Sequence, residues 1–135
     1  MIFCFSAFVP PKILIPTVAV RKSVPVLTVE HEKCLDFIKQ SVAESTAEHI
    51  VVVTHHLPTM AVVASEHKGN LLNSAFATEL GDFIADSRID AWIFGHSHAN
   101  IDATINNTRI VSNQLGYVYY RENLGGFDGR KVIEV

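Results

Sequence analysis

Two short apolar runs, each followed by histidine, most constrain how this chain can fold. Residues 50–54 read Ile-Val-Val-Val-Thr, a wholly β-branched run that is typical of a buried strand. Residues 91–94 form a second apolar run, which Gly95 ends. Between the two runs, residues 73–86 have the apolar spacing of a helix. A strand–helix–strand order of this kind predicts two parallel strands joined by a right-handed crossover.

The histidines that follow these two strands are candidate metal ligands. His55 follows the first strand, and His96 and His98 follow the second. Because ligands collect beyond the carboxyl ends of strands in open α/β sheets, we expect the three side chains to lie together at one sheet edge. Neutral imidazole is a common metal ligand at pH 7. A pattern this short also leaves open the alternative that these histidines are ordinary core or surface residues.

Two segments in the first two thirds of the chain have the residue pattern of a helix. Residues 29–43 are predicted to form an amphipathic helix, with Cys34 buried on its apolar side and His31 exposed at its start. Asn73 is a good N-cap for the helix predicted over residues 73–86, and Gly81 interrupts that helix at a modest cost.

Strands dominate the carboxyl end of the sequence. Residues 101–105 and 108–112 flank Asn106-Asn107, a sequence typical of a two-residue hairpin turn. Residues 131–135 are predicted to form a last strand. The fold class predicted for the whole chain is therefore α/β, with α+β character at the carboxyl end.

Residues 1–23 form an atypical apolar segment. Its first twenty residues carry one charge, Lys12, and several prolines interrupt the apolar sequence. We expect extended segments over residues 2–9 and 13–20, because a membrane span needs about 20 unbroken apolar residues and a signal peptide begins with positive charge. If exposed, this segment would offer a surface through which the chain could form a homo-oligomer.

Composition excludes several classes of function. The chain has 135 residues, 48% of them hydrophobic, which suffices for one globular core. Its net charge of −3 and the lack of a basic run argue against nucleic acid or an anionic membrane as a partner. Cys4 and Cys34 are too few for a disulfide framework, which fits a cytoplasmic location.

Three segments of the sequence together resemble a known enzyme family. They are Thr54-His55-His56-Leu57-Pro58, Trp92-Ile93-Phe94-Gly95-His96-Ser97-His98 and Ser112-Asn113-Gln114-Leu115-Gly116-Tyr117. In this order they resemble the carboxyl-terminal half of the calcineurin-like metallophosphoesterases, over about residues 24–135. The resemblance implies half of a two-sheet sandwich flanked by helices. It also implies hydrolysis of phosphomonoesters or phosphodiesters by metal-activated water.

The resemblance also implies roles for individual histidines. His55 and His96 would bind one metal ion, and His98 would bind the second ion of a site that holds two in this family. His56 matches no family ligand and is expected to support the site through its neighbours. Mn, Fe or Zn would suit ligands of this type.

The family's amino-terminal motifs, Asp-x-His, Gly-Asp and Gly-Asn-His-Asp/Glu, do not occur in place in this sequence. Gly81-Asp82 follows His55 rather than preceding it, and Gly69-Asn70 is followed by Leu71. We therefore expect a truncated phosphoesterase domain that holds at most one ion and has little activity alone, with its catalytic residues unknown. The alternative is a non-catalytic remnant that folds or dimerises and binds metal weakly or not at all.

Overall fold

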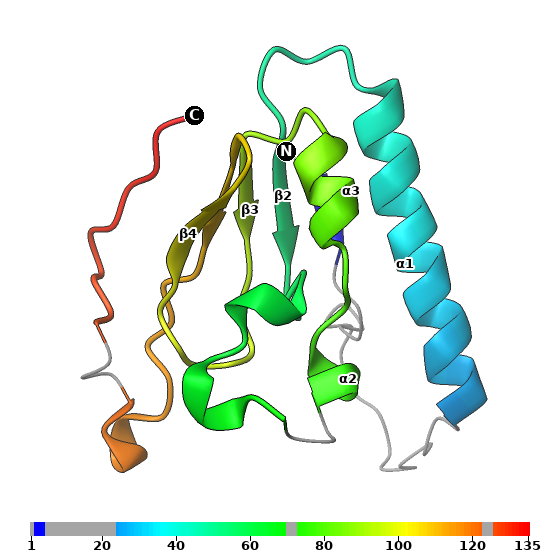
Figure 1. The fold of residues 1–135 in the computed structure, drawn as a ribbon. Coiled ribbons are helices and arrows are strands. Elements are labelled where there is room, and N and C mark those ends of the chain that lie inside the picture. Colours follow the sequence, from blue (N-terminus) through cyan, green and yellow to red (C-terminus); the bar gives the residue numbers. More distant parts are fainter. Residues whose placement is uncertain (1, 5–23, 70–72, 123–125) are drawn as a thin grey trace, which may run out of the picture.

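The computed structural model describes residues 2–4, 24–69, 73–122 and 126–135. Its helices are α1 (Val24–Glu44), α2 (Asn73–Phe76) and α3 (Gly81–Asp86), and three short 3-10 helices are η1 (Met60–Val62), η2 (Ser65–His67) and η3 (Val118–Tyr120). Its strands are β1 (Ile2–Cys4), β2 (Val51–Thr54), β3 (Ala91–Ile93), β4 (Asp102–Ile105) and β5 (Thr108–Val111) (Figure 1). The predicted α/β class is confirmed at this level.

The strands of the described residues form one mixed sheet in the order β1-β2-β3-β5-β4. Neighbours from β1 to β5 pair in parallel, and β4 and β5 form an antiparallel hairpin around Asn106, whose φ is 49°. The predicted parallel pairing of residues 50–54 with 91–94 and the predicted hairpin are both confirmed. The two-sheet sandwich of the family resemblance stays a prediction, because the described residues contribute a single sheet.

One face of the sheet forms the core with α1 and α3. Val52, Trp92 and Ile110 are register partners on three adjacent strands, and all are fully buried. They belong to the same cluster of buried residues as Ile38 of α1 and Ile84 of α3. Figure 1 shows these helices alongside the strands. This burial holds the ends of β2 and β3 in fixed positions, from which the histidine loops begin.

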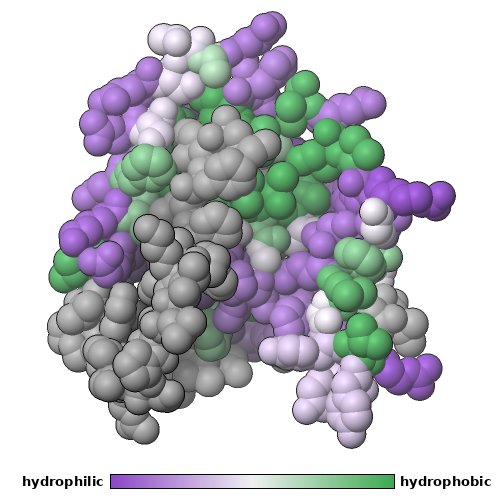
Figure 2. All heavy atoms as spheres, turned by 180° about the vertical axis from the view of Figure 1, so that it is seen from behind, coloured by the Kyte–Doolittle hydropathy of each residue, from purple (hydrophilic) through white to green (hydrophobic). Residues whose placement is uncertain are grey.

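The other face of the sheet is less covered by the described residues. Val53 and Ile93 are the next register partners along β2 and β3, and both are half-buried, whereas Val111, the partner of Ile93 on β5, is buried. Figure 2, which views the molecule from behind, shows hydrophobic residues reaching the surface beside polar ones. The alternation of the strands thus separates a buried face from a partly exposed one.

The prediction of one helix over residues 73–86 is wrong, because the chain forms two short helices, α2 and α3, with an extended break over residues 77–80. In the break, Ala77 forms an isolated parallel bridge with Leu57. The N–H of Thr78 donates to the carbonyl of Leu57 at 3.0 Å, and the N–H of Leu80 donates to that of Pro58 at 3.0 Å. Backbone pairing with the loop after β2 therefore replaces helical hydrogen bonds, and Gly81 begins α3 instead of interrupting a longer helix.

The predicted first helix begins earlier than residue 29, since α1 starts at Val24. Pro25 then lies in its first turn, where a missing N–H costs nothing. Cys34 packs half-buried against the core, as expected, but the exposed position predicted for His31 is wrong. His31 is half-buried, and its Nε2 lies 3.2 Å from Oγ1 of Thr78.

The strand predicted over residues 131–135 is also wrong. Lys131 Nζ lies 3.1 Å from the carboxylate of Asp102, so this segment meets β4 through a side chain and not through a backbone ladder. Of the apolar amino-terminal segment, residues 2–4 form β1 as expected, and the extended segment predicted over 13–20 lies outside the described residues. No helix in the described residues is long and apolar enough to cross a membrane.

Candidate metal centre

The loops after β2 and β3 lie side by side because their backbones are hydrogen-bonded to each other. The N–H of Gly95 donates to the carbonyl of His55 at 3.0 Å. A Cβ at position 95 would lie 3.4 Å from that carbonyl oxygen and 3.6 Å from Nδ1 of the His55 ring. A Cβ at position 95 would thus be in ordinary van der Waals contact with His55, which shows how closely the two histidine-bearing loops pack.

This approach brings three imidazole rings together. Nδ1 of His96 lies 3.1 Å from Nε2 of His55. One ring nitrogen from each of His55, His56 and His96 lies within 4.8 Å of the others. The ring of His96 stands nearly perpendicular to those of His55 and His56, at centroid distances of 5.0 and 4.8 Å. We refer to these three residues as the histidine group.

The donor set of the histidine group suits a zinc-like ion. Nitrogens bound at 2.0–2.1 Å to a tetrahedral Zn²⁺ lie about 3.4 Å apart, close to the 3.1 Å between His96 and His55. His56 would need only a small movement to bring its nitrogen to the same separation. Three imidazole ligands with a fourth position open is a known arrangement for Zn²⁺.

Two members of the histidine group, His56 and His96, have lowered pKa values. Burial lowers the pKa of His56 to about 4, with further lowering by the charges of His96, His55 and His31. Burial also lowers the pKa of His96, followed by the charges of His55 and His98. Because a metal ion binds the neutral form of imidazole, these shifts favour metal over protons.

The backbone at the second loop is strained. His96 and His98 have φ angles of 72° and 55°, in the left-handed region that favours glycine. Residues held in such conformations cost about 1–3 kcal/mol each, and they cluster at functional sites. The backbone conformations that orient these two side chains therefore lower the stability of the loop.

His98, which the sequence places with His55 and His96, lies beside the histidine group and not within it. Its Nδ1 lies 2.9 Å from the carboxylate of Glu122. Since a carboxylate only accepts, Nδ1 of His98 carries the proton, and in the neutral ring the lone pair is on Nε2. The ring of Tyr117 packs edge-on against it at 4.7 Å. Two of the three predicted histidines therefore come together, and His56 takes the third place.

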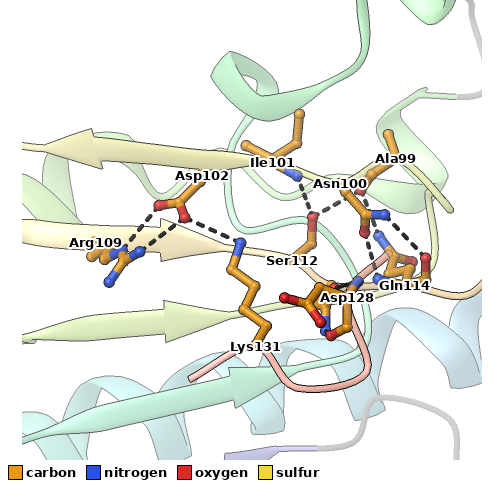
Figure 3. A network of polar contacts seen from close by, with 10 residues as sticks. Ala99, Asn100, Ile101, Asp102, Arg109, Ser112, Gln114, Asp128 and Lys131 are labelled. Atoms are coloured by element: carbon orange, nitrogen blue, oxygen red, sulfur yellow. Dashed lines mark hydrogen bonds and ion pairs between the residues drawn. The ribbon is translucent and has the colours of Figure 1, made fainter. Parts of the chain in front are cut away.

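Gln114 anchors the loop that carries His96 and His98. Its side-chain oxygen accepts from the N–H of His98 at 3.0 Å, and its amide donates to Ser97 Oγ at 3.2 Å and to the Ala99 carbonyl at 2.9 Å. Figure 3 shows Gln114 with Asn100 and Ser112, the latter donating to the Ala99 carbonyl at 2.8 Å. The loop is fixed by side chains from the segment after β5.

Reasoning from the sequence assigned His56 a different role at this site and missed Glu122. The sequence predicts that His56 supports the site through its neighbours, whereas its ring nitrogen lies in one group with those of His55 and His96. Glu122 lies 24 residues from His98 in an irregular segment, and no sequence pattern indicates their contact.

Comparison with known proteins adds one relative. The chain is 28% identical over 100 residues to "Uncharacterized protein L509" of Acanthamoeba polyphaga mimivirus. The match covers 69% of this chain and 35% of that protein, so the chain spans about a third of its relative's length. The sequence matches no family model and no solved structure.

Proposed function

We propose that the histidine group binds one divalent metal ion and that this site serves the hydrolysis of phosphate esters. The observation that carries the proposal is the convergence of His55, His56 and His96, with nitrogens within 4.8 Å, at the carboxyl ends of two neighbouring parallel strands. Metal sites that act on substrates keep a coordination position open, which three protein ligands allow. Zn, Mn or Fe are the ions that such ligands accept.

The resemblance to calcineurin-like metallophosphoesterases supplies the reaction class. A bound metal would supply a polarised phosphoryl oxygen and activated water. His55 and His96 hold the same places in this proposal as in the resemblance, and His56, which matches no family ligand, becomes the third ligand of the same ion. His98 is held by Glu122 beside the histidine group, with its proton on Nδ1. We also propose a cytoplasmic location, which the free thiol of Cys34 supports.

A phosphatase assay tests this function. We expect hydrolysis of an aryl phosphate that requires added Mn²⁺ or Zn²⁺ and is lost in His96→Ala. The rate should fall below about 1 s⁻¹, the low end of typical enzymes, because the described residues place no carboxylate in the histidine group to hold a second ion. Turnover that is independent of metal, or unchanged in His96→Ala, would contradict the proposal.

The same lack of a carboxylate favours a second candidate, a metal-binding domain without catalysis. In that case the chain would take up one ion through the histidine group and show no hydrolysis above the His96→Ala background. Metal uptake with and without turnover separates the two candidates.

A further inference from the structure

A cavity of about 250 Å³ opens directly beside the histidine group. His96 forms part of its wall, and the remaining wall is mainly apolar, from Leu57, Val63, Phe76 and Ala77. A cavity of about 150 Å³ with apolar walls can hold benzene. The volume beside His96 is therefore large enough for one aromatic ring with a substituent.

The walls of this cavity are built before any ligand arrives. Leu57, Val63 and Ala77 are buried, with exposed fractions of 4%, 8% and 7%. The N–H of Leu57 donates to the carbonyl of Phe76 at 3.1 Å, and the N–H of Val63 donates to that of Met60 at 3.2 Å. A preformed apolar cavity binds without a cost for ordering its own residues.

The side chain of His96 belongs both to the wall of the cavity and to the histidine group. The ring of Phe76 stacks on the ring of His96 at a centroid distance of 4.6 Å and an interplanar angle of 29°. Nδ1 of His96 faces His55. A ligand in the cavity would thus touch one side of a residue whose ring nitrogen belongs to the histidine group. Asn73 and Ser97 supply polar atoms at the same cavity.

We propose that this cavity, the aryl pocket, receives the alcohol part of a phosphate ester whose alcohol is a single aromatic ring, while the histidine group takes the phosphoryl end. The inference rests on the proposed function for the phosphoryl end only. The aryl pocket itself needs no metal, so each part can be tested alone.

The first test uses the metal-free chain and 4-fluorophenol as a probe, with fluorine NMR to follow the probe and proton–carbon NMR to follow the methyl groups of the protein. We expect saturable binding at millimolar concentrations, as for a small fragment, with shifts of the methyl signals of Val63 and Ala77. Ala64→Trp should fill the pocket and abolish binding, because Ala64 lines it and is half-buried. Ala47→Trp is the matched control, since Ala47 is exposed in the loop before β2.

The second test compares phenylphosphonate with methylphosphonate on the zinc-loaded chain by calorimetry. The phenyl compound should bind at least about tenfold more tightly, since its ring loses water contact, and Ala64→Trp should remove that preference. Fluorophenol binding without zinc uptake would leave the aryl pocket standing and contradict the proposed function. No fluorophenol binding, or binding without methyl shifts at Val63 and Ala77, would overturn the inference even if Ala64→Trp did not fold.

Discussion

Nδ1 of His96 lies 3.1 Å from Nε2 of His55, although 41 residues separate them in the sequence. One of these nitrogens must carry a proton and the other a lone pair. A metal ion that binds both nitrogens needs a lone pair on each, so the protonated ring would have to move its proton to its other ring nitrogen, and binding by two neutral imidazoles releases no net proton. The contact depends on the parallel pairing of β2 and β3 and on the hydrogen bond from the N–H of residue 95 to the carbonyl of His55.

The strained backbone at His96 predicts an unusual order of stabilities. The free energy of unfolding of His96→Gly should exceed that of His96→Ala by about 1–2 kcal/mol, because the left-handed conformation is unfavourable for alanine and not for glycine. Urea denaturation of the metal-free variants measures the difference. At Lys39, on the exposed side of α1, the order should reverse, with glycine less stable than alanine by about 0.5–1 kcal/mol. Equal stabilities at position 96 would show that the loop relaxes.

Gln114→Ala should loosen the histidine loop. It removes three hydrogen bonds, to His98, Ser97 and Ala99, and it takes away the acceptor of the partly buried His98 N–H. We expect a loss of about 1–3 kcal/mol in the free energy of unfolding and weaker zinc binding. Gln40→Ala, on the exposed side of α1, is the control and should change stability by less than about 0.5 kcal/mol. Unchanged zinc affinity in Gln114→Ala would show that the loop needs no such anchor.

Thr108→Val tests the junction between α3 and β5. The hydroxyl of Thr108 is buried and donates to the carbonyl of Ile89 at 2.7 Å. Valine has the same shape but cannot donate, so we expect about 1–3 kcal/mol of destabilisation in a thermal or urea melt. Thr104→Val, at an exposed position on β4, should have an effect within about 0.5 kcal/mol. Similar effects at both positions would argue against the buried hydrogen bond.

The lowered pKa of Asp102 predicts that the free energy of unfolding depends on pH. Hydrogen bonds from Arg109 lower its pKa from 3.8 to about 2, and Lys131 adds to the effect. Below its unfolded pKa the unfolded carboxylate takes up protons before the folded one, so the stabilisation is complete above about pH 4 and is lost as the pH falls toward 2. The stability difference between wild type and Asp102→Asn should therefore shrink over this interval. Asp36→Asn, at an exposed position on α1, is the control, and an unchanging Asp102→Asn difference would contradict the prediction.

The sheet could be predicted from sequence because its signals are local. The β-branched run before His55 and the apolar run before Gly95 fix two strands, and the Asn106-Asn107 turn fixes a hairpin. The convergence of His55 and His96 follows from strand direction alone. Strand type and turn signals of this kind can be recognised from the neighbouring residues alone.

The break between α2 and α3 could not be predicted in the same way. It arises because the backbone of residues 77–80 pairs with the loop around Leu57, some twenty residues earlier. The contact of Glu122 with His98 likewise joins two irregular segments. Such tertiary contacts override helical periodicity, and neither leaves a pattern in the sequence.

The central claim is that His55, His56 and His96 hold one metal ion, and zinc titration calorimetry of single alanine variants tests it most directly. We expect one site in the wild type, a loss of at least about tenfold in affinity in His55→Ala, His56→Ala and His96→Ala because each removes one of few ligands, and no change in His49→Ala, whose residue is exposed at the opposite end of β2 from His55. His98→Ala should change the affinity less than His56→Ala does. Equal zinc affinity in the wild type and in all three variants of the histidine group would contradict the account.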